Sequence, residues 1–138
     1  MIVWAATTFF LSTLSNQQIE EIIPFKFWDK LGHFLLFSTG GALIAAALRL
    51  TTGWGWGRII LVASIVASVY GATDEWHQQF TPGRSAKDVG DWTADTLGGL
   101  FGSVFASLVM AKVRFLRVWL RLEPRGKKAD GPVQSVAL

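Results

Sequence analysis

The sequence predicts an all-α membrane protein, a bundle of four transmembrane helices with both termini in the cytoplasm. Hydrophobic residues make up 51% of the 138 residues and charged residues only 17%. The chain also contains seven Trp and 14 Gly, and this composition suits a small polytopic membrane protein better than a soluble domain. The length fits a single domain. The absence of Cys excludes disulfides and thiolate chemistry.

Four apolar stretches are the expected spans, at about residues 1–14, 30–50, 58–76 and 91–113. Together they form the expected transmembrane domain, residues 1–113. Fourteen helical residues rise about 21 Å, whereas the hydrocarbon core is about 30 Å thick. The sequence therefore leaves open whether the first stretch crosses the bilayer completely. Asp29 precedes the second stretch, and its residue type favours a helix N-cap there.

Small residues predict how the helices pack. Ala94, Gly98, Gly102 and Ala106 lie four residues apart, so they share one helix face and allow another helix to approach closely. Such small-residue faces are also the expected route to a homo-oligomer. Between the second and third spans, residues 53–57 read Gly-Trp-Gly-Trp-Gly, which predicts a tight turn with two Trp at the membrane interface.

The basic residues predict the orientation of the bundle. Alternating spans place nine Lys and Arg with the termini and the second connection, and four on the opposite side. The excess predicts that the termini side is cytoplasmic. Six of the nine lie in the expected basic cytoplasmic tail, residues 114–138. The first and third connections are therefore expected to face outward, away from the cytoplasm.

Polar residues gather at that outward side. Adjacent carboxylates at the end of an apolar run are costly near a bilayer, so Asp74-Glu75 indicates function. Two close carboxylates disfavour joint ionisation, so one can act as acid and another as base. The candidate acid–base residues are Asp74, Glu75, His33 and Asp91; the candidate ligand-binding residues are Arg84, Gln78, Asp29 and Asp95.

Structural roles compete with each of these functional ones. Asp29 is more often a helix cap than a catalytic residue, and Arg84 would equally well pair with Asp88 or Asp91 and fix the loop. A divalent cation held by Asp74, Glu75 and Asp91, with or without His, is a further alternative. Because no closed ligand spacing is present, neither a metal nor another cofactor is expected.

Three separated motifs resemble the VanZ-like family of small bacterial membrane proteins. They are Asp29-(x3)-His33-(x3)-Phe37, then Asp74-Glu75-(x2)-Gln78-(x)-Phe80-(x3)-Arg84, then Asp91-(x3)-Asp95-(x2)-Gly98-(x3)-Gly102. The resemblance covers residues 29–102 and implies a small helical integral membrane protein of the bacterial cytoplasmic (inner) membrane. With the orientation above, the polar cluster is expected on the outer face of that membrane. The family takes its name from a protein associated with low-level teicoplanin resistance. Two positions differ from the family pattern: Phe37 stands where Tyr is common, and Asp95 where Asn is frequent.

Two functions of different classes follow. The first is an envelope factor that binds an outward-facing lipid-linked or glycopeptide head group through the acidic, His and Arg cluster, with a link to teicoplanin resistance. The alternative is a membrane enzyme that performs acid–base chemistry on a lipid-linked phosphate or sugar. An enzyme requires the carboxylates and Arg84 around a cavity open to lipid. Membrane lipids are the expected partners of either, and nucleic acid is not.

Overall fold

The computed structural model describes residues 1–15, 17–18, 21, 26–84 and 88–119, and the side chains of all of these except 26–29 and 117–119. The helices in this part of the chain are α1 (Ile2–Ser12), α3 (Lys26–Thr51), α4 (Trp56–Gln78) and α5 (Val89–Trp119). None of the described residues forms a strand. The all-α prediction is therefore confirmed for these residues.

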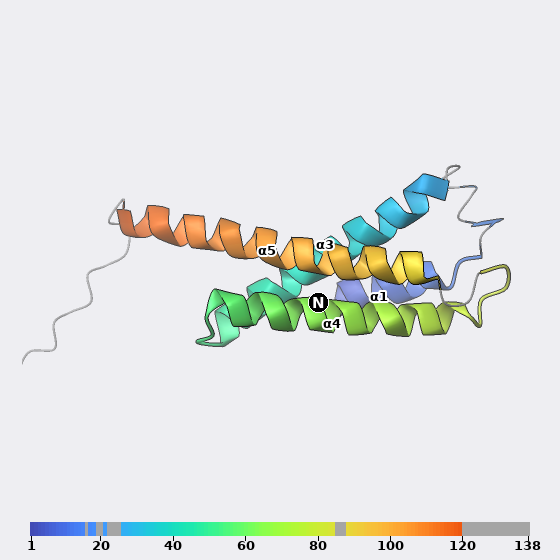
Figure 1. Cartoon of the computed structure of the whole chain (residues 1–138), viewed down its shortest axis with the longest axis horizontal. Coiled ribbons are helices and arrows are strands. Elements are labelled where there is room, and N and C mark those ends of the chain that lie inside the picture. Colours follow the sequence, from blue (N-terminus) through green and yellow to red (C-terminus); the bar gives the residue numbers. More distant parts are fainter. Residues whose placement is uncertain (16, 19–20, 22–25, 85–87, 120–138) are drawn as a thin grey trace, which may run out of the picture.

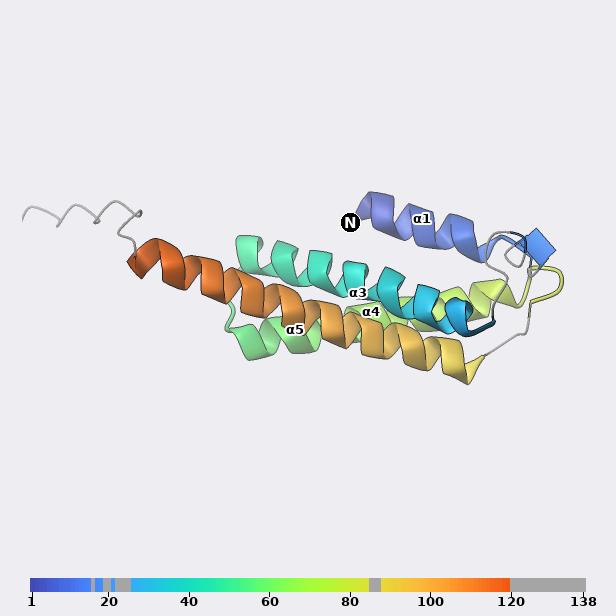
Figure 2. The same ribbon diagram turned by 90° about the horizontal axis from the view of Figure 1, so that it is seen from above.

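Three helices are long and apolar enough to cross a membrane: α3, α4 and α5. Helix α1 has 11 residues, a length of roughly 17 Å, and it runs beside only part of the bundle (Figure 2). The three long helices are therefore candidate spans, and the expected bundle of four transmembrane helices stays a prediction. The orientation of the termini stays a prediction. So does the division into a domain of residues 1–113 and a tail, most of which lies outside the described residues.

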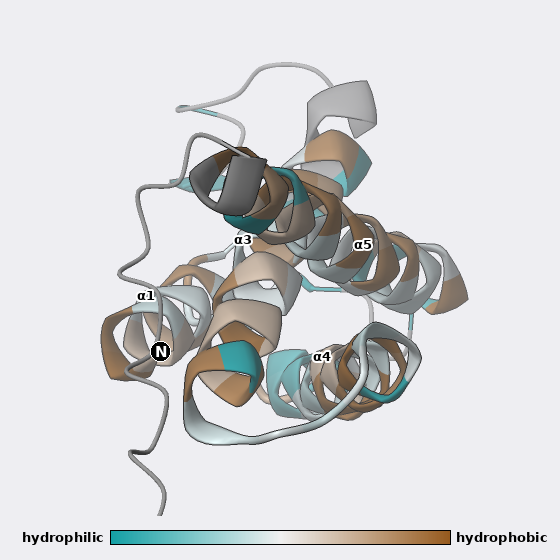
Figure 3. Cartoon of the chain, turned by 90° about the vertical axis from the view of Figure 1, so that its left-hand side faces the viewer, coloured by the Kyte–Doolittle hydropathy of each residue, from teal (hydrophilic) through white to brown (hydrophobic). Residues whose placement is uncertain are grey.

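The core of the fold is a three-helix bundle of α3, α4 and α5, and α1 packs against α3 and α4. Figure 3, which looks along the bundle, shows α1 and α5 on different sides of α3. The outward surfaces of α4 and α5 carry exposed large apolar side chains, among them Leu61, Val69 and Leu108. Apolar side chains on the outside of a bundle are what a lipid environment favours.

The interface between α3 and α5 depends on the predicted small residues. A Cβ on Gly98 would collide with the Phe34 carbonyl, and one on Gly102 would collide with the Ser38 carbonyl. Gly99 in turn lies against Gly41. The backbones of α3 and α5 therefore lie in direct contact, as the spacing of Gly98 and Gly102 predicted.

Helix α1 is attached by specific contacts of Trp4. Its indole Nε1 donates to the Leu36 carbonyl at 2.9 Å, and its ring lies where Gly40 leaves space. From α4, the Tyr70 hydroxyl donates to the Ala5 carbonyl at 2.8 Å. Phe37 is fully buried and packs against both aromatic rings. These bonds fix α1 beside α3 and α4 although it is short.

The expected cap at Asp29 is wrong. Helix α3 begins at Lys26, so Asp29 already lies inside its first turn and cannot be the flanking residue. The predicted turn at residues 53–57 does lie between two helices, α3 and α4. There Arg49 lies over the ring of Trp56 and Arg58 over that of Trp54, at 4.5 and 4.0 Å from the ring centroids.

Candidate functional site

Four helix ends meet at one end of the bundle. In Figure 1 the last turns of α1 and α4 and the first turns of α3 and α5 lie together on the right, with the α4–α5 loop. Because the candidate residues belong to these turns, the fold brings together side chains that are more than 60 residues apart, such as His33 and Asp95. The convergence predicted from the alternation of spans is thus present.

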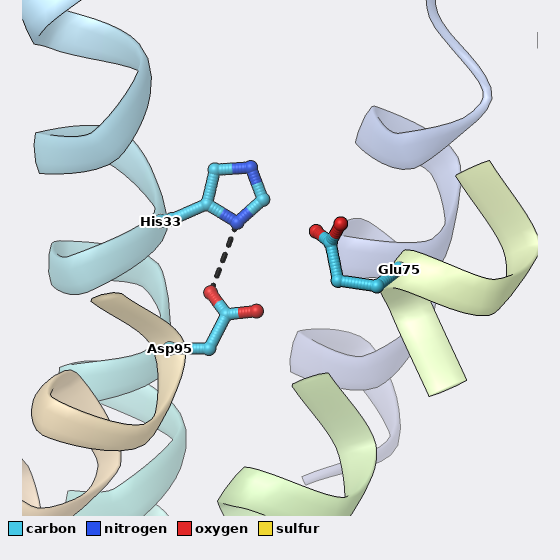
Figure 4. Close-up of side chains that lie close together, drawn as sticks. All are labelled: His33, Glu75 and Asp95. Carbon is cyan, nitrogen blue, oxygen red and sulfur yellow. Dashed lines mark hydrogen bonds and ion pairs between the residues drawn. The ribbon is translucent and has the colours of Figure 1, made fainter. Parts of the chain in front are cut away.

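The centre of this end is a cluster of His33, Glu75 and Asp95, one from each of the three long helices (Figure 4). His33 Nδ1 lies 2.9 Å from Asp95 Oδ1. One ligand atom from each residue lies within 4.8 Å of the other two. His33 therefore faces Glu75, another candidate acid–base residue, as well as Asp95. Its hydrogen-bonded partner is Asp95, which sequence reasoning had assigned only to ligand binding.

Both carboxylates of the cluster are buried. The exposed fraction is 5% for Glu75 and zero for Asp95. Space for the Asp95 carboxylate comes from Gly71, where an added Cβ would lie 2.8 Å from both Asp95 Cβ and Oδ2. Glu75 Oε2 accepts a hydrogen bond from the Asp88 backbone N–H at 2.9 Å. The other oxygens, Glu75 Oε1 and Asp95 Oδ2, are buried without a hydrogen-bond partner, which is costly for a carboxylate.

A second chain of polar side chains joins α4 to the end of α1. Asp74 Oδ2 accepts from Gln78 Nε2 at 2.8 Å, and Gln78 Oε1 accepts from Arg84 Nη1 at 2.9 Å. Arg84 Nε also donates to the Leu14 carbonyl at 3.2 Å. The expected pairing of Arg84 with Asp88 or Asp91 is therefore wrong, because both carboxylates pair with Lys30 instead. The Arg84 side chain lies toward α1, whose last carbonyls need donors.

Asp91 instead pairs with Lys30, whose Nζ lies 2.7 Å from Asp91 Oδ1 and 3.4 Å from Asp88 Oδ1. Asp88 precedes α5 and accepts hydrogen bonds from the Gly90 and Asp91 backbone N–H groups, so it is the N-cap of that helix. Burial acts to raise the pKa of Asp88, but these N–H groups and the Lys30 ammonium outweigh it and hold the pKa below its ordinary value.

Sequence reasoning did not assign Lys30 or Asp88 to the site. Lys30 lies three residues before His33, and this spacing places both on one face of α3. Asp88 stands three residues before Asp91 at the start of an apolar run, a spacing typical of an N-cap. His77 joins α4 to α1 at the same end, since its Nδ1 lies 3.1 Å from Ser12 Oγ. The Asp29 side chain lies outside the described residues.

A groove opens beside the cluster, between the end of α4 and the start of α5. Its lining residues are Ala72, Glu75, Trp76, Asp88, Val89 and Trp92. The surface is almost entirely apolar, and Trp76, Trp92 and Val89 are exposed along it. Trp92 is fixed by its indole Nε1, which donates to the Ser68 carbonyl at 3.1 Å. Glu75 belongs both to the groove and to the buried cluster.

The chemistry available at this end is dominated by hydrogen-bond acceptors. Asp74 and Asp91 are satisfied by Gln78 and Lys30, whereas Glu75 and Asp95 retain oxygens without a donor. Of the cation ligands proposed from sequence, Asp74, Glu75 and Asp91, only Glu75 belongs to the group whose ligand atoms lie together. The arrangement can accept donors or a cation, and His33 can carry a proton between them.

Comparison with known proteins bears on these results. The sequence model of the VanZ/LLP1 family matches residues 1–110, so it spans α1, α3, α4 and most of α5. The match includes every residue of the central cluster. No curated protein and no solved structure gives a significant match.

Proposed function

The chain belongs to the VanZ/LLP1 family, and we propose that it binds the head group of a membrane lipid where the groove meets the acidic cluster. Family membership and three long apolar helices make it a VanZ-like multi-pass membrane protein. The proposed ligand is a lipid-linked head group, of the class that includes cell-wall precursors. The observation that carries the proposal is the apolar groove that ends at Glu75 and Asp88.

The groove suits one hydrocarbon chain. Its volume is about 240 Å³, below the roughly 300–1,000 Å³ of a site that encloses a small molecule. The exposed rings of Trp76 and Trp92 have the amphipathic character that places such residues at the membrane interface. A lipid chain therefore lies between α4 and α5, with its polar end toward Glu75.

The proposed head-group site contains carboxylate acceptors in the groove and one Lys side chain beside it. Glu75 and Asp88 line the groove, and carboxylates accept hydrogen bonds from hydroxyl, amide or amine donors. Lys30 pairs with Asp88, and its side chain is half exposed, so a phosphate near Asp88 has a cation within reach. A head group that combines sugar or peptide donors with phosphate fits this arrangement.

The excess of basic residues supports an outward location for this end. Arg49, Arg58 and Lys112 lie at the opposite end of the three long helices, and the other basic residues of the nine follow Lys112 in the sequence. By the positive-inside rule that opposite end is cytoplasmic. The head group is thus bound on the outer face of the bacterial cytoplasmic membrane.

The test is native mass spectrometry of the purified protein with its copurified lipids. Ala72→Trp places a large ring in the groove and should reduce bound lipid at least about 10-fold, while Ile65→Trp adds the same ring on a lipid-facing part of α4 and should not. Asp74→Asn tests whether the neighbouring Gln78 network contributes. Equal lipid retention by the Ala72 and Ile65 variants would contradict the proposal.

A second measurement distinguishes a lipid-linked precursor from a glycopeptide as the source of the head group. Titration of the protein in nanodiscs with teicoplanin tests the glycopeptide as ligand, and titration with a polyprenyl-phosphate sugar tests the lipid-linked precursor. Binding of the second alone, weakened by Ala72→Trp, supports the proposal. Binding of teicoplanin alone would contradict the proposal, because the ligand would then be a glycopeptide and not a lipid head group.

An enzyme remains the second candidate, because Glu75 lies both in the groove and in the cluster with His33 and Asp95. Glu75 and His33 then exchange protons with a lipid-linked phosphate or sugar. Asp74 and Asp91 are engaged by Gln78 and Lys30 and act as positioning residues. Product release from a lipid-linked substrate in vesicles, abolished by Glu75→Gln, would favour the enzyme over the binding protein.

A further inference from the structure

When both carboxylates of the buried cluster are ionised, they require compensating positive charge. Glu75 and Asp95 are both buried carboxylates, and a protonated His33 would offset only one of them. Among the described residues, the basic side chains at this end are engaged elsewhere: Lys30 with Asp91 and Asp88, and Arg84 with Gln78 and the Leu14 carbonyl. Uncompensated buried charge is strongly unfavourable.

Two atoms point to where a cation would lie. Glu75 Oε1 and Asp95 Oδ2 are buried and have no hydrogen-bond partner. In Figure 4 the Glu75 carboxylate points from α4 toward His33 and Asp95, across the space between the helices. Buried polar atoms in native proteins almost always have partners, so a ligand that contacts these two oxygens explains them.

We propose that His33, Glu75 and Asp95 bind one divalent transition-metal cation, of which Zn²⁺ fits best. One imidazole nitrogen and two carboxylate oxygens form a mixed N/O set that suits Zn²⁺, whereas Mg²⁺ and Ca²⁺ prefer oxygen alone. Zinc with three protein ligands keeps a fourth position for water. No sequence spacing indicated this site, because each ligand comes from a different helix.

The three ligand atoms need to move only a little closer together to bind a zinc ion. Zinc ligands lie about 2.0–2.2 Å from the ion, so two ligand atoms of a tetrahedral site are about 3.4 Å apart. The three ligand atoms here lie within 4.8 Å of one another. His33 and Asp95 are in direct hydrogen-bond contact at 2.9 Å, and the cation replaces the proton that they share. Glu75 also lines the groove, so the cluster adjoins an opening at the surface. The site does not depend on lipid occupying that groove.

The test uses the full chain without an affinity tag, purified in detergent and stripped with EDTA. Calorimetric titration with Zn²⁺ and elemental analysis after desalting should give one ion per chain, and Zn²⁺ should raise the melting temperature. Asp95→Asn and Glu75→Gln should each weaken binding at least about 100-fold, somewhat beyond the effect of losing an outer-shell partner. The matched control is Glu21→Gln, which removes an exposed carboxylate that belongs neither to the cluster nor to the groove, and it should bind as wild type does.

Each outcome decides the proposal. Far-UV circular dichroism and gel filtration establish which variants are folded, and the two amide variants at different helices provide a second measurement if one does not fold. Stoichiometric Zn²⁺ that is lost in a folded amide variant supports the site. Absence of binding by wild type, or equal binding by Glu21→Gln and both cluster variants, overturns it. Titration with Mn²⁺ and Mg²⁺ should show weaker binding; Mg²⁺ as the tighter ligand would overturn the assignment to a transition metal.

Discussion

The close contact of α3 with α5 makes a sharp prediction for Gly102→Ala. A Cβ at Gly102 would lie 2.6 Å from the Ser38 carbonyl carbon and 2.9 Å from Ser38 Cα. These are backbone atoms, so they cannot move away by a change of rotamer. The two helices must separate, and the substitution should lower the free energy of unfolding.

The magnitude follows from a matched control. Gly32 lies on the exposed side of α3, and an added Cβ there has no neighbour within 4 Å. Gly32→Ala should therefore stabilise the protein slightly, by about 0.5–1 kcal/mol, because Ala is a better helix former. Gly102→Ala receives the same gain but adds the overpacking cost of about 1–3 kcal/mol. The gain in helix propensity is the same in both variants, so their free energies of unfolding should differ by the overpacking cost.

The assay is unfolding in mixed detergent micelles, followed by circular dichroism as the fraction of denaturing detergent rises. Gly102→Leu should be less stable still, since a larger side chain meets the same backbone. Equal unfolding midpoints for Gly102→Ala and Gly32→Ala would show that the α3–α5 contact is looser than the structure has it. The small-residue face would then have to serve another purpose, such as self-association.

Three further outcomes are expected. Because the chain has no native Cys, Pro82→Cys should react with a membrane-impermeant maleimide in intact cells, and Gly53→Cys only after permeabilisation; the opposite pattern would reverse the orientation. Tyr70→Phe removes the hydrogen bond to the Ala5 carbonyl and should lower the free energy of unfolding by about 0.5–1.5 kcal/mol, whereas an unchanged value would mean that α1 is held without it. The pKa of Asp88 is lowered in the folded protein, so its contribution to stability is complete above the pKa of the unfolded chain and is lost as pH falls through the folded pKa. The stability difference between wild type and Asp88→Asn should therefore shrink in acid, and a difference that grows in acid would contradict this sign.

Periodic features of the sequence determined the fold class and the location of the site. Long apolar runs required helices, because a backbone in lipid must satisfy its own hydrogen bonds. Residues four apart on one helix share a face whatever surrounds them, so the contact face of Gly98 and Gly102 was predictable. Alternation of the spans then required the polar helix ends to meet.

The pairing of polar side chains was decided only by the tertiary structure. Several partners compete for each charge at this end, and the distances depend on how far each helix is rotated and displaced. Helix α3 begins at Lys26, so Lys30 lies on its first turns, where it pairs with Asp91. Arg84 instead donates to the Leu14 carbonyl, just after the end of α1. Gly71 leaves room for Asp95, which brings that carboxylate to His33. Such contacts depend on side-chain packing between helices, and spacing along one chain does not encode them.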